Sequence, residues 1–155
     1  MNEIRTIVVD SREQLPFTFD GLPVRTVRQK LDVGDYAMLN LPGCVVERKA
    51  PGDLLSCIAG GRDRFVRELE RLQELDFSAV VCEGTLQELL SGDHSRISPQ
   101  SVIGTLLAWQ QRYPRTHWWF APNRAWAEKL TYKILDRFQR DTIEGKRPVT
   151  ESIGA

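Results

Sequence analysis

Short apolar runs alternate with amphipathic segments along most of the chain, and this alternation restricts the folds open to it. Runs rich in β-branched residues predict strands at residues 4–9, 24–27, 36–39, 44–49, 77–82 and 117–120. Segments whose apolar residues recur every three or four positions predict helices at residues 51–58, 62–75, 85–90, 99–113 and 122–138. Elements in this order predict an α/β fold, with helices flanking a mixed β-sheet.

The connections between these elements suggest one domain followed by a tail. We expect the strands at 24–27, 36–39 and 44–49 to form an antiparallel meander, because the loops between them are tight and contain glycine and proline. Residues 1–140 are enough for one compact domain with a sizeable core. Residues 141–155 are polar and contain glycine and proline, so we expect this tail to be poorly ordered or used only in assembly.

Composition excludes a membrane-spanning chain and a disulfide-rich secreted domain. The hydrophobic share is 41%, but no apolar stretch approaches the roughly 20 residues that cross a bilayer. Cys44, Cys57 and Cys82 are odd in number and lie in apolar segments, so we expect buried, reduced thiols. The N-terminus has no signal-peptide pattern. We therefore expect a soluble intracellular protein that does not bind membranes, cytoplasmic in a prokaryote or phage and nuclear in a eukaryote.

Charged residues gather at the ends of predicted strands, although the formal net charge of the chain is zero. Four carboxylates stand there, at Asp10, Glu13, Asp35 and Glu47. Side chains at positions i and i+2 of a strand point to the same face, so Glu47 and Lys49 project together while Arg48 projects away. If Asp35 heads a neighbouring strand, its carboxylate meets that of Glu47.

Two carboxylates and a lysine in one pocket suit metal-assisted phosphodiester hydrolysis. The carboxylates repel each other unless a cation lies between them. Mg²⁺ suits that position, because it prefers oxygen ligands and retains several waters. The bound cation activates water, and the lysine adds positive charge where negative charge develops on the phosphate.

The motif around these residues resembles the signature of the XPF family of structure-specific endonucleases, G-D-x(n)-E-R-K-x-x-x-D. The matching positions are Gly34-Asp35, Glu47-Arg48-Lys49 and Asp53. The flanks also match, since Val9-Asp10-Ser11-Arg12-Glu13 is similar to the V-D-x-R-E of the family's first strand. The segments Leu54 to Ile58, Gly61-Arg62, Phe65 and Arg71-Leu72 are similar to the family sequence after the signature, in the same order.

The resemblance implies a restriction-endonuclease-like core for residues 1–140, with DNA as the partner and a role in DNA repair or recombination. It implies catalytic roles for Asp35, Glu47, Lys49, Arg48 and Asp53. It implies that Mg²⁺ or Mn²⁺ is bound by Asp35, Glu47, Asp10 and Glu13. It implies that DNA is contacted by Arg12 and Arg62. Because the family dimerises through its nuclease domains, a homodimer is expected, with Trp109, Trp126 and the last helix offering an apolar face.

The chain departs from the family in one respect, because we see no tandem helix-hairpin-helix module after the nuclease-like region. Our leading hypothesis is a metal-dependent DNA endonuclease that acts on branched or single-strand/double-strand junction DNA. One alternative is a catalytically silent DNA-binding or scaffolding subunit, although such subunits typically lose the acidic and lysine positions. Another is a nuclease for a different nucleic acid, because a shared core does not determine the substrate.

Overall fold

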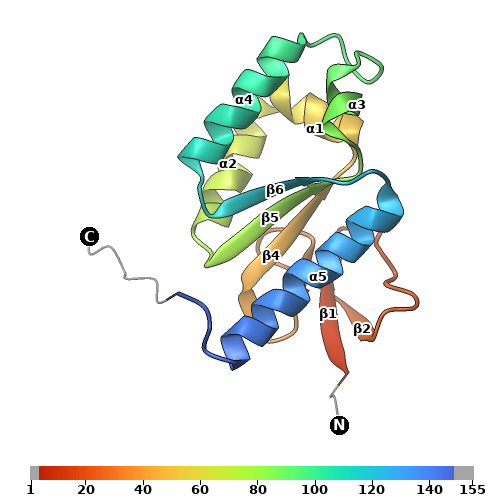
Figure 1. The fold of residues 1–155 in the computed structure, drawn as a ribbon, viewed down its shortest axis with the longest axis vertical. Helices are drawn as coiled ribbons and strands as arrows, with labels where there is room; N and C mark the ends of the chain where they lie inside the picture. Colours follow the sequence, from red (N-terminus) through yellow and green to blue (C-terminus); the bar gives the residue numbers. More distant parts are fainter. Residues whose placement is uncertain (1–3, 149–155) are drawn as a thin grey trace.

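The computed structural model describes residues 4–148 and shows, within them, a six-stranded mixed sheet with helices on both faces (Figure 1). The strands are β1 (Arg5–Asp10), β2 (Val24–Gln29), β3 (Tyr36–Met38), β4 (Leu41–Lys49), β5 (Phe77–Cys82) and β6 (Thr116–Phe120). The helices are α1 (Pro51–Ile58), α2 (Arg62–Gln73), α3 (Leu86–Leu90), α4 (Pro99–Arg112) and α5 (Arg124–Ile143). The predicted α/β class and mixed sheet are confirmed.

The strand order is β2-β1-β3-β4-β5-β6, and this corrects the predicted meander. Strands β3 and β4 do form an antiparallel pair, but β2 does not join them, because it lies at the sheet edge, parallel to β1. The burial of each strand explains the difference. The last four residues of β1 are buried, so this strand gains from a neighbour on each side, whereas β2 carries exposed Arg25, Thr26 and Arg28 and suits an edge.

The two faces of the sheet are covered by different helices. Figure 1 shows α5 lying alone across one face, while α1 to α4 cover the other. Alternate residues of β4 divide between the two hydrophobic cores, with Val46 packing on the α5 side and Val45 on the side of α1, α2 and α4. By this alternation, Glu47 and Lys49 belong to the side of α1 and α2, and Arg48 to the side of α5.

Helix starts follow the local signals in the sequence. Helix α4 begins with Ser98 as N-cap, whose hydroxyl accepts a hydrogen bond from the Ser101 N–H, and with Pro99 in its first turn. Helix α3 begins with a capping box of Thr85 and Glu88. Among residues 4–148, no helix is both long and apolar enough to cross a membrane.

The last helix extends past the predicted domain boundary at residue 140. Helix α5 runs to Ile143, into the segment expected to be a tail. Beyond it, the Arg147 guanidinium lies 3.8 Å from the centre of the Phe138 ring and 3.7 Å from an oxygen of Asp76. The segment up to residue 148 therefore packs on the domain, because the Arg147 side chain covers the Phe138 ring. The rest of the predicted tail, residues 149–155, lies outside the described residues.

Gly34 is required by the entry into β3. Its φ of +80° lies in the left-handed region, where side chains are strained. A β-carbon at this position would also lie 2.9 Å from Cγ2 of Val45. The glycine therefore lets the chain pass closely over β4, so that Asp35 enters the sheet beside Glu47.

Candidate active site

Three neighbouring strands bring the predicted acidic residues together. The Asp10 N–H donates to the Asp35 carbonyl at 2.8 Å, and the Asp35 N–H donates to the Val46 carbonyl at 2.9 Å. Asp10 and Glu47 thus lie on β1 and β4, and Asp35 lies between them, immediately before β3, at the same end of the sheet. This adjacency connects residues that are far apart in the sequence.

Asp35 and Glu47 form a pair of neighbouring acids, with Asp35 partly buried and Glu47 buried. Burial raises the pKa of Asp35 to about 7. This effect outweighs the lowering by a 2.8 Å hydrogen bond that Oδ2 of Asp35 accepts from the Arg48 backbone N–H. Burial, together with the charge of Asp35, raises the pKa of Glu47 well above its ordinary value. Without a cation, both carboxyl groups therefore bind protons more tightly than water-exposed carboxylates do, and a cation placed between them would displace those protons.

Lys49 lies beside this pair, as the strand alternation predicts. Its Nζ is 3.6 Å from Oε1 of Glu47 and 5.1 Å from the centre of the Phe65 ring. Burial lowers the pKa of Lys49, but the negative charges of Glu47 and its neighbours outweigh that effect and raise it. The side chain is only 17% exposed and carries a positive charge held next to the acids.

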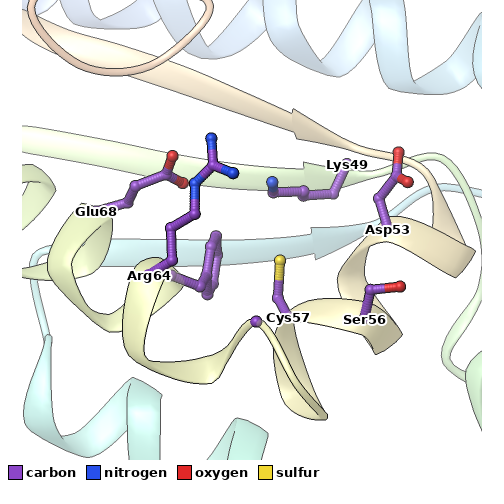
Figure 2. A pocket seen from close by; sticks show the side chains of 8 residues that line it. Lys49, Asp53, Ser56, Cys57, Arg64 and Glu68 are labelled. Carbon is purple, nitrogen blue, oxygen red and sulfur yellow. The ribbon is translucent and has the colours of Figure 1, made fainter.

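A cavity of about 330 Å³ opens next to Lys49. Figure 2 shows Lys49 at the end of its strand, facing side chains that come from α1 and α2. The lining residues are Lys49, Asp53, Ser56, Cys57, Gly61, Arg64, Phe65 and Glu68. Cys44, Cys57 and Cys82 are free thiols, but Cys57 is only partly buried, because it lines this cavity rather than the core.

Arg48 points to the opposite face of the sheet and holds two acids there. Its Nε and Nη2 donate to the two oxygens of Glu13 at 3.0 and 2.8 Å, and its Nη1 donates to Glu83 at 3.2 Å. The side chains of Arg48, Glu13 and Glu83 are all nearly buried, at 12%, 7% and 11% exposed. Burial raises the pKa of Glu13, but the bonds from Arg48 outweigh it and lower the pKa.

Asp10 and Arg12 form a second pair at the same end of the sheet. Arg12 Nε donates to Asp10 Oδ2 at 2.9 Å, and the Leu31 N–H donates to Oδ1 at 2.9 Å. Burial raises the pKa of Asp10, but these bonds outweigh it and lower the pKa. The Arg12 side chain is 59% exposed, so its positive charge is accessible to a ligand near the acids.

Arg62 makes two hydrogen bonds within the helical layer, and its predicted contact with DNA stays a prediction. Its Nη2 donates to the Thr105 hydroxyl at 2.6 Å, and its Nε donates to the Ile58 carbonyl at 3.2 Å. These bonds join α2 to α4 and α1, away from the acids. The arginine that lines the cavity is Arg64, which the sequence did not single out. It is one of several arginines on α2, and only the packing of that helix shows which one faces Lys49.

The sequence profile of the ERCC4 domain matches residues 9–134. The chain belongs to the ERCC4 domain family. Among solved structures, XPF from Aeropyrum pernix is similar with a TM-score of 0.73 at 19% identity, over 91% of this chain and 68% of that one. XPF from Aeropyrum pernix in complex with DNA is similar with a TM-score of 0.67 at 20% identity, over 95% of this chain and 70% of that one. A search of curated protein sequences finds no significant match.

These matches confirm the predicted XPF resemblance and the restriction-endonuclease-like fold of this ERCC4 domain. They cover the region in which Asp35, Glu47 and Lys49 meet. Two residues that contact the site were missed in the sequence, namely Glu83 and Arg124. Neither residue stands at a spacing that marks a motif. Glu83 contacts the signature residue Arg48, and Arg124 contacts Glu83, and both contacts arise only from tertiary packing.

The predicted metal ligands of this ERCC4 domain differ in their surroundings. The carboxylates of Asp10 and Glu13 are bound by the guanidinium groups of Arg12 and Arg48. In the part of the chain that the structure describes, the carboxylates of Asp35 and Glu47 have no such arginine side chain bound to them. Within residues 4–148, no three acidic, histidine or cysteine side chains converge as a metal site. The carboxylates of Asp35 and Glu47 still fit Mg²⁺, which is commonly held by one or two carboxylates, waters and a substrate phosphate. Metal ligation by Asp10 and Glu13 stays a prediction that requires their arginine partners to move.

Proposed function

We propose that this protein is a metal-dependent DNA endonuclease that acts on branched or single-strand/double-strand junction DNA. The observation that carries the proposal is the pair of the partly buried Asp35 and the buried Glu47, with Lys49 beside it, 3.6 Å from Glu47. Its membership of the ERCC4 domain family and the DNA complex of the similar XPF from Aeropyrum pernix support DNA as the substrate.

Each residue of the site has a role in this chemistry. Asp35 and Glu47 hold Mg²⁺ or Mn²⁺, which supplies Lewis-acid activation of water and of the phosphodiester when bound. The Arg48 backbone N–H occupies Oδ2 of Asp35 and so orients that carboxylate. Lys49 stabilises the negative charge that grows on the phosphate. Asp53 lines the same cavity, and a role in orienting the basic groups stays a prediction.

The arginines near the site are suited to phosphate. Arg12 stands exposed beside Asp10, and Arg64 lines the cavity next to Lys49. A guanidinium binds two phosphate oxygens through parallel hydrogen bonds, so each residue can fix the DNA backbone on one side of the scissile bond. We expect salt to weaken this binding, because phosphate contacts release counterions.

A cleavage panel with and without divalent metal tests the proposal. Flap, splayed-arm, Holliday-junction, duplex and single-stranded DNA are incubated with Mg²⁺, Mn²⁺ or EDTA, and products are resolved on denaturing gels. We expect cleavage of junction substrates with Mg²⁺ or Mn²⁺ and none with EDTA. Cleavage of plain duplex or single-stranded DNA alone would contradict the proposed substrate. If calorimetry detects no metal binding and no DNA is cleaved, a silent scaffolding subunit would be favoured instead.

We also propose that the protein forms a homodimer through its nuclease domain. Trp119 on β6 and Trp126 on α5 are both about half exposed, and β6 is an edge strand of the sheet. Trp109, expected on the same surface, is instead buried against Phe65 and Trp118, because α4 packs on α2 and β6. Exposed aromatic side chains beside a free strand edge are typical of interfaces.

Light scattering at micromolar concentration tests the dimer. We expect the mass of two chains for the wild type and a shift toward one chain for Trp126→Glu, which introduces a charge into the apolar contact. Lys133→Glu is a matched control on an exposed position of α5 and should leave the mass unchanged. A wild type that is strictly monomeric would reject the homodimer.

A further inference from the structure

Glu83 lies directly after β5 and connects two arginines from distant parts of the chain. Its Oε1 accepts a hydrogen bond from Arg48 Nη1 at 3.2 Å and one from Arg124 Nη1 at 2.6 Å. Arg48 belongs to β4 and Arg124 to the first turn of α5. Two positive groups share a single carboxylate that is almost buried, and the interaction with the nearly buried Arg48 is screened little by water, whereas Arg124 is 43% exposed.

Arg124 extends this connection to the loop between β1 and β2. Its Nη2 donates to the Leu15 carbonyl at 2.6 Å, and its guanidinium lies 4.7 Å from the centre of the Phe17 ring. One turn along α5, a carboxylate oxygen of Glu128 accepts the Phe19 N–H at 3.1 Å. The first turns of α5 therefore hold the loop at three successive points.

The loop held in this way carries Glu13, and Glu13 returns to Arg48 through two hydrogen bonds. Arg48 in turn donates its backbone N–H to Oδ2 of Asp35 at 2.8 Å. The contacts thus run from α5 through Glu83 to the main chain that orients Asp35. Arg48 is fixed on two sides, by Glu13 from the loop and by Glu83 from the sheet.

We propose that Glu83, together with Arg124, is a positioning residue of the active site. It acts through Arg48. The backbone N–H of Arg48 orients the Asp35 carboxylate, and the Arg48 guanidinium binds the negatively charged Glu13. The inference rests on the proposed function, since it assigns Glu83 to the same site. Residues that orient a metal ligand from behind typically contribute 10- to 100-fold to metal affinity or activity.

The test compares Glu83→Ala, Glu83→Gln and Arg124→Ala with the wild type. For Glu83→Ala we expect kcat on the best junction substrate to fall by about 10- to 100-fold, with a similar loss of Mn²⁺ affinity by calorimetry. The Kd for DNA, measured in EDTA, should stay within about twofold, because the exposed arginines near the cavity are unchanged. Glu83→Gln keeps an acceptor oxygen and should recover part of the loss.

A double variant shows whether the two residues act through one network. If they do, the double variant Glu83→Ala/Arg124→Ala loses no more kcat and Mn²⁺ affinity than the single variant with the larger loss. Additive losses would overturn the joint role. Arg124→Ala removes a side chain that is 43% exposed, so it keeps the inference testable if Glu83→Ala does not fold. Circular dichroism and thermal unfolding confirm the fold of each variant.

Glu74→Gln and Arg137→Ala are the matched controls, since both residues are exposed and distant from the site. Both should cleave DNA and bind Mn²⁺ as the wild type does. Folded Glu83→Ala and Arg124→Ala proteins with wild-type kcat and Mn²⁺ affinity would overturn the positioning role and leave the proposed function intact. A wild type that cuts no DNA and binds no metal would overturn the proposed function and the inference with it.

Discussion

Lys49→Ala is expected to reduce DNA cleavage by at least about a hundredfold, the effect of removing one preorganised group that stabilises transition-state charge. Lys49 Nζ stands 3.6 Å from Glu47 and borders the cavity, so its charge lies where the phosphate would bind. The loss should appear in kcat, measured in single-turnover reactions with saturating enzyme. Lys133→Ala, which removes an exposed lysine from α5, should cleave normally.

Asp35→Asn is expected to reduce DNA cleavage by at least the same factor as Lys49→Ala, while the protein still folds. The amide oxygen can accept the Arg48 N–H as Oδ2 does, but the neutral side chain is a poor ligand for Mg²⁺. If either Asp35→Asn or Lys49→Ala cuts as well as the wild type, the active site is assigned to the wrong residues.

The stability of Asp35→Asn provides an independent check. Burial raises the pKa of Asp35 from its ordinary value of 3.8 to about 7 in the folded protein. A raised pKa means that the carboxyl group costs stability once pH exceeds 3.8, with the full cost reached above pH 7. Without metal, Asp35→Asn should therefore unfold at a higher temperature than the wild type at pH 8, and the difference should disappear near pH 4.

Arg48→Ala is expected to lower the free energy of unfolding by about 3–5 kcal/mol, the usual result of removing one partner from a buried ion pair. Arg48 neutralises Glu13 and Glu83, and all three side chains are nearly buried. Its loss leaves two carboxylates without that partner in a site that excludes water. For a chain of this size the midpoint Tm should fall by about 10 °C, measured by calorimetry or circular dichroism.

Two further variants separate the buried network from ordinary surface charge. Arg48→Lys keeps the positive charge but cannot bind Glu13 through two parallel bonds, so its loss should be intermediate. Arg137→Ala breaks a pair with Asp141 in which the arginine is largely exposed, and should change stability by less than about 1 kcal/mol. An Arg48→Ala protein as stable as Arg137→Ala would mean that Glu13 and Glu83 do not depend on Arg48.

Local signals in the sequence determined where most elements begin and end, and which residues share a face. The strand β5 and the start of α4 follow from short-range patterns of hydrophobicity and capping. The spacing of Glu47 and Lys49 placed both on one face, because side chains alternate along a strand.

Only the tertiary structure decided which of these residues meet. The insertion of β1 between β2 and β3 makes Asp10 and Asp35 neighbours, and this order depends on long-range burial that no local pattern records. The same holds for Arg48, whose partners come from the loop after β1 and from the end of β5. The sequence by itself therefore determined the chemistry of Asp35, Glu47 and Lys49. Packing alone decided that Glu13 binds Arg48, that Arg64 lines the cavity, and that Glu83 and Arg124 contact each other and, through Glu83, Arg48.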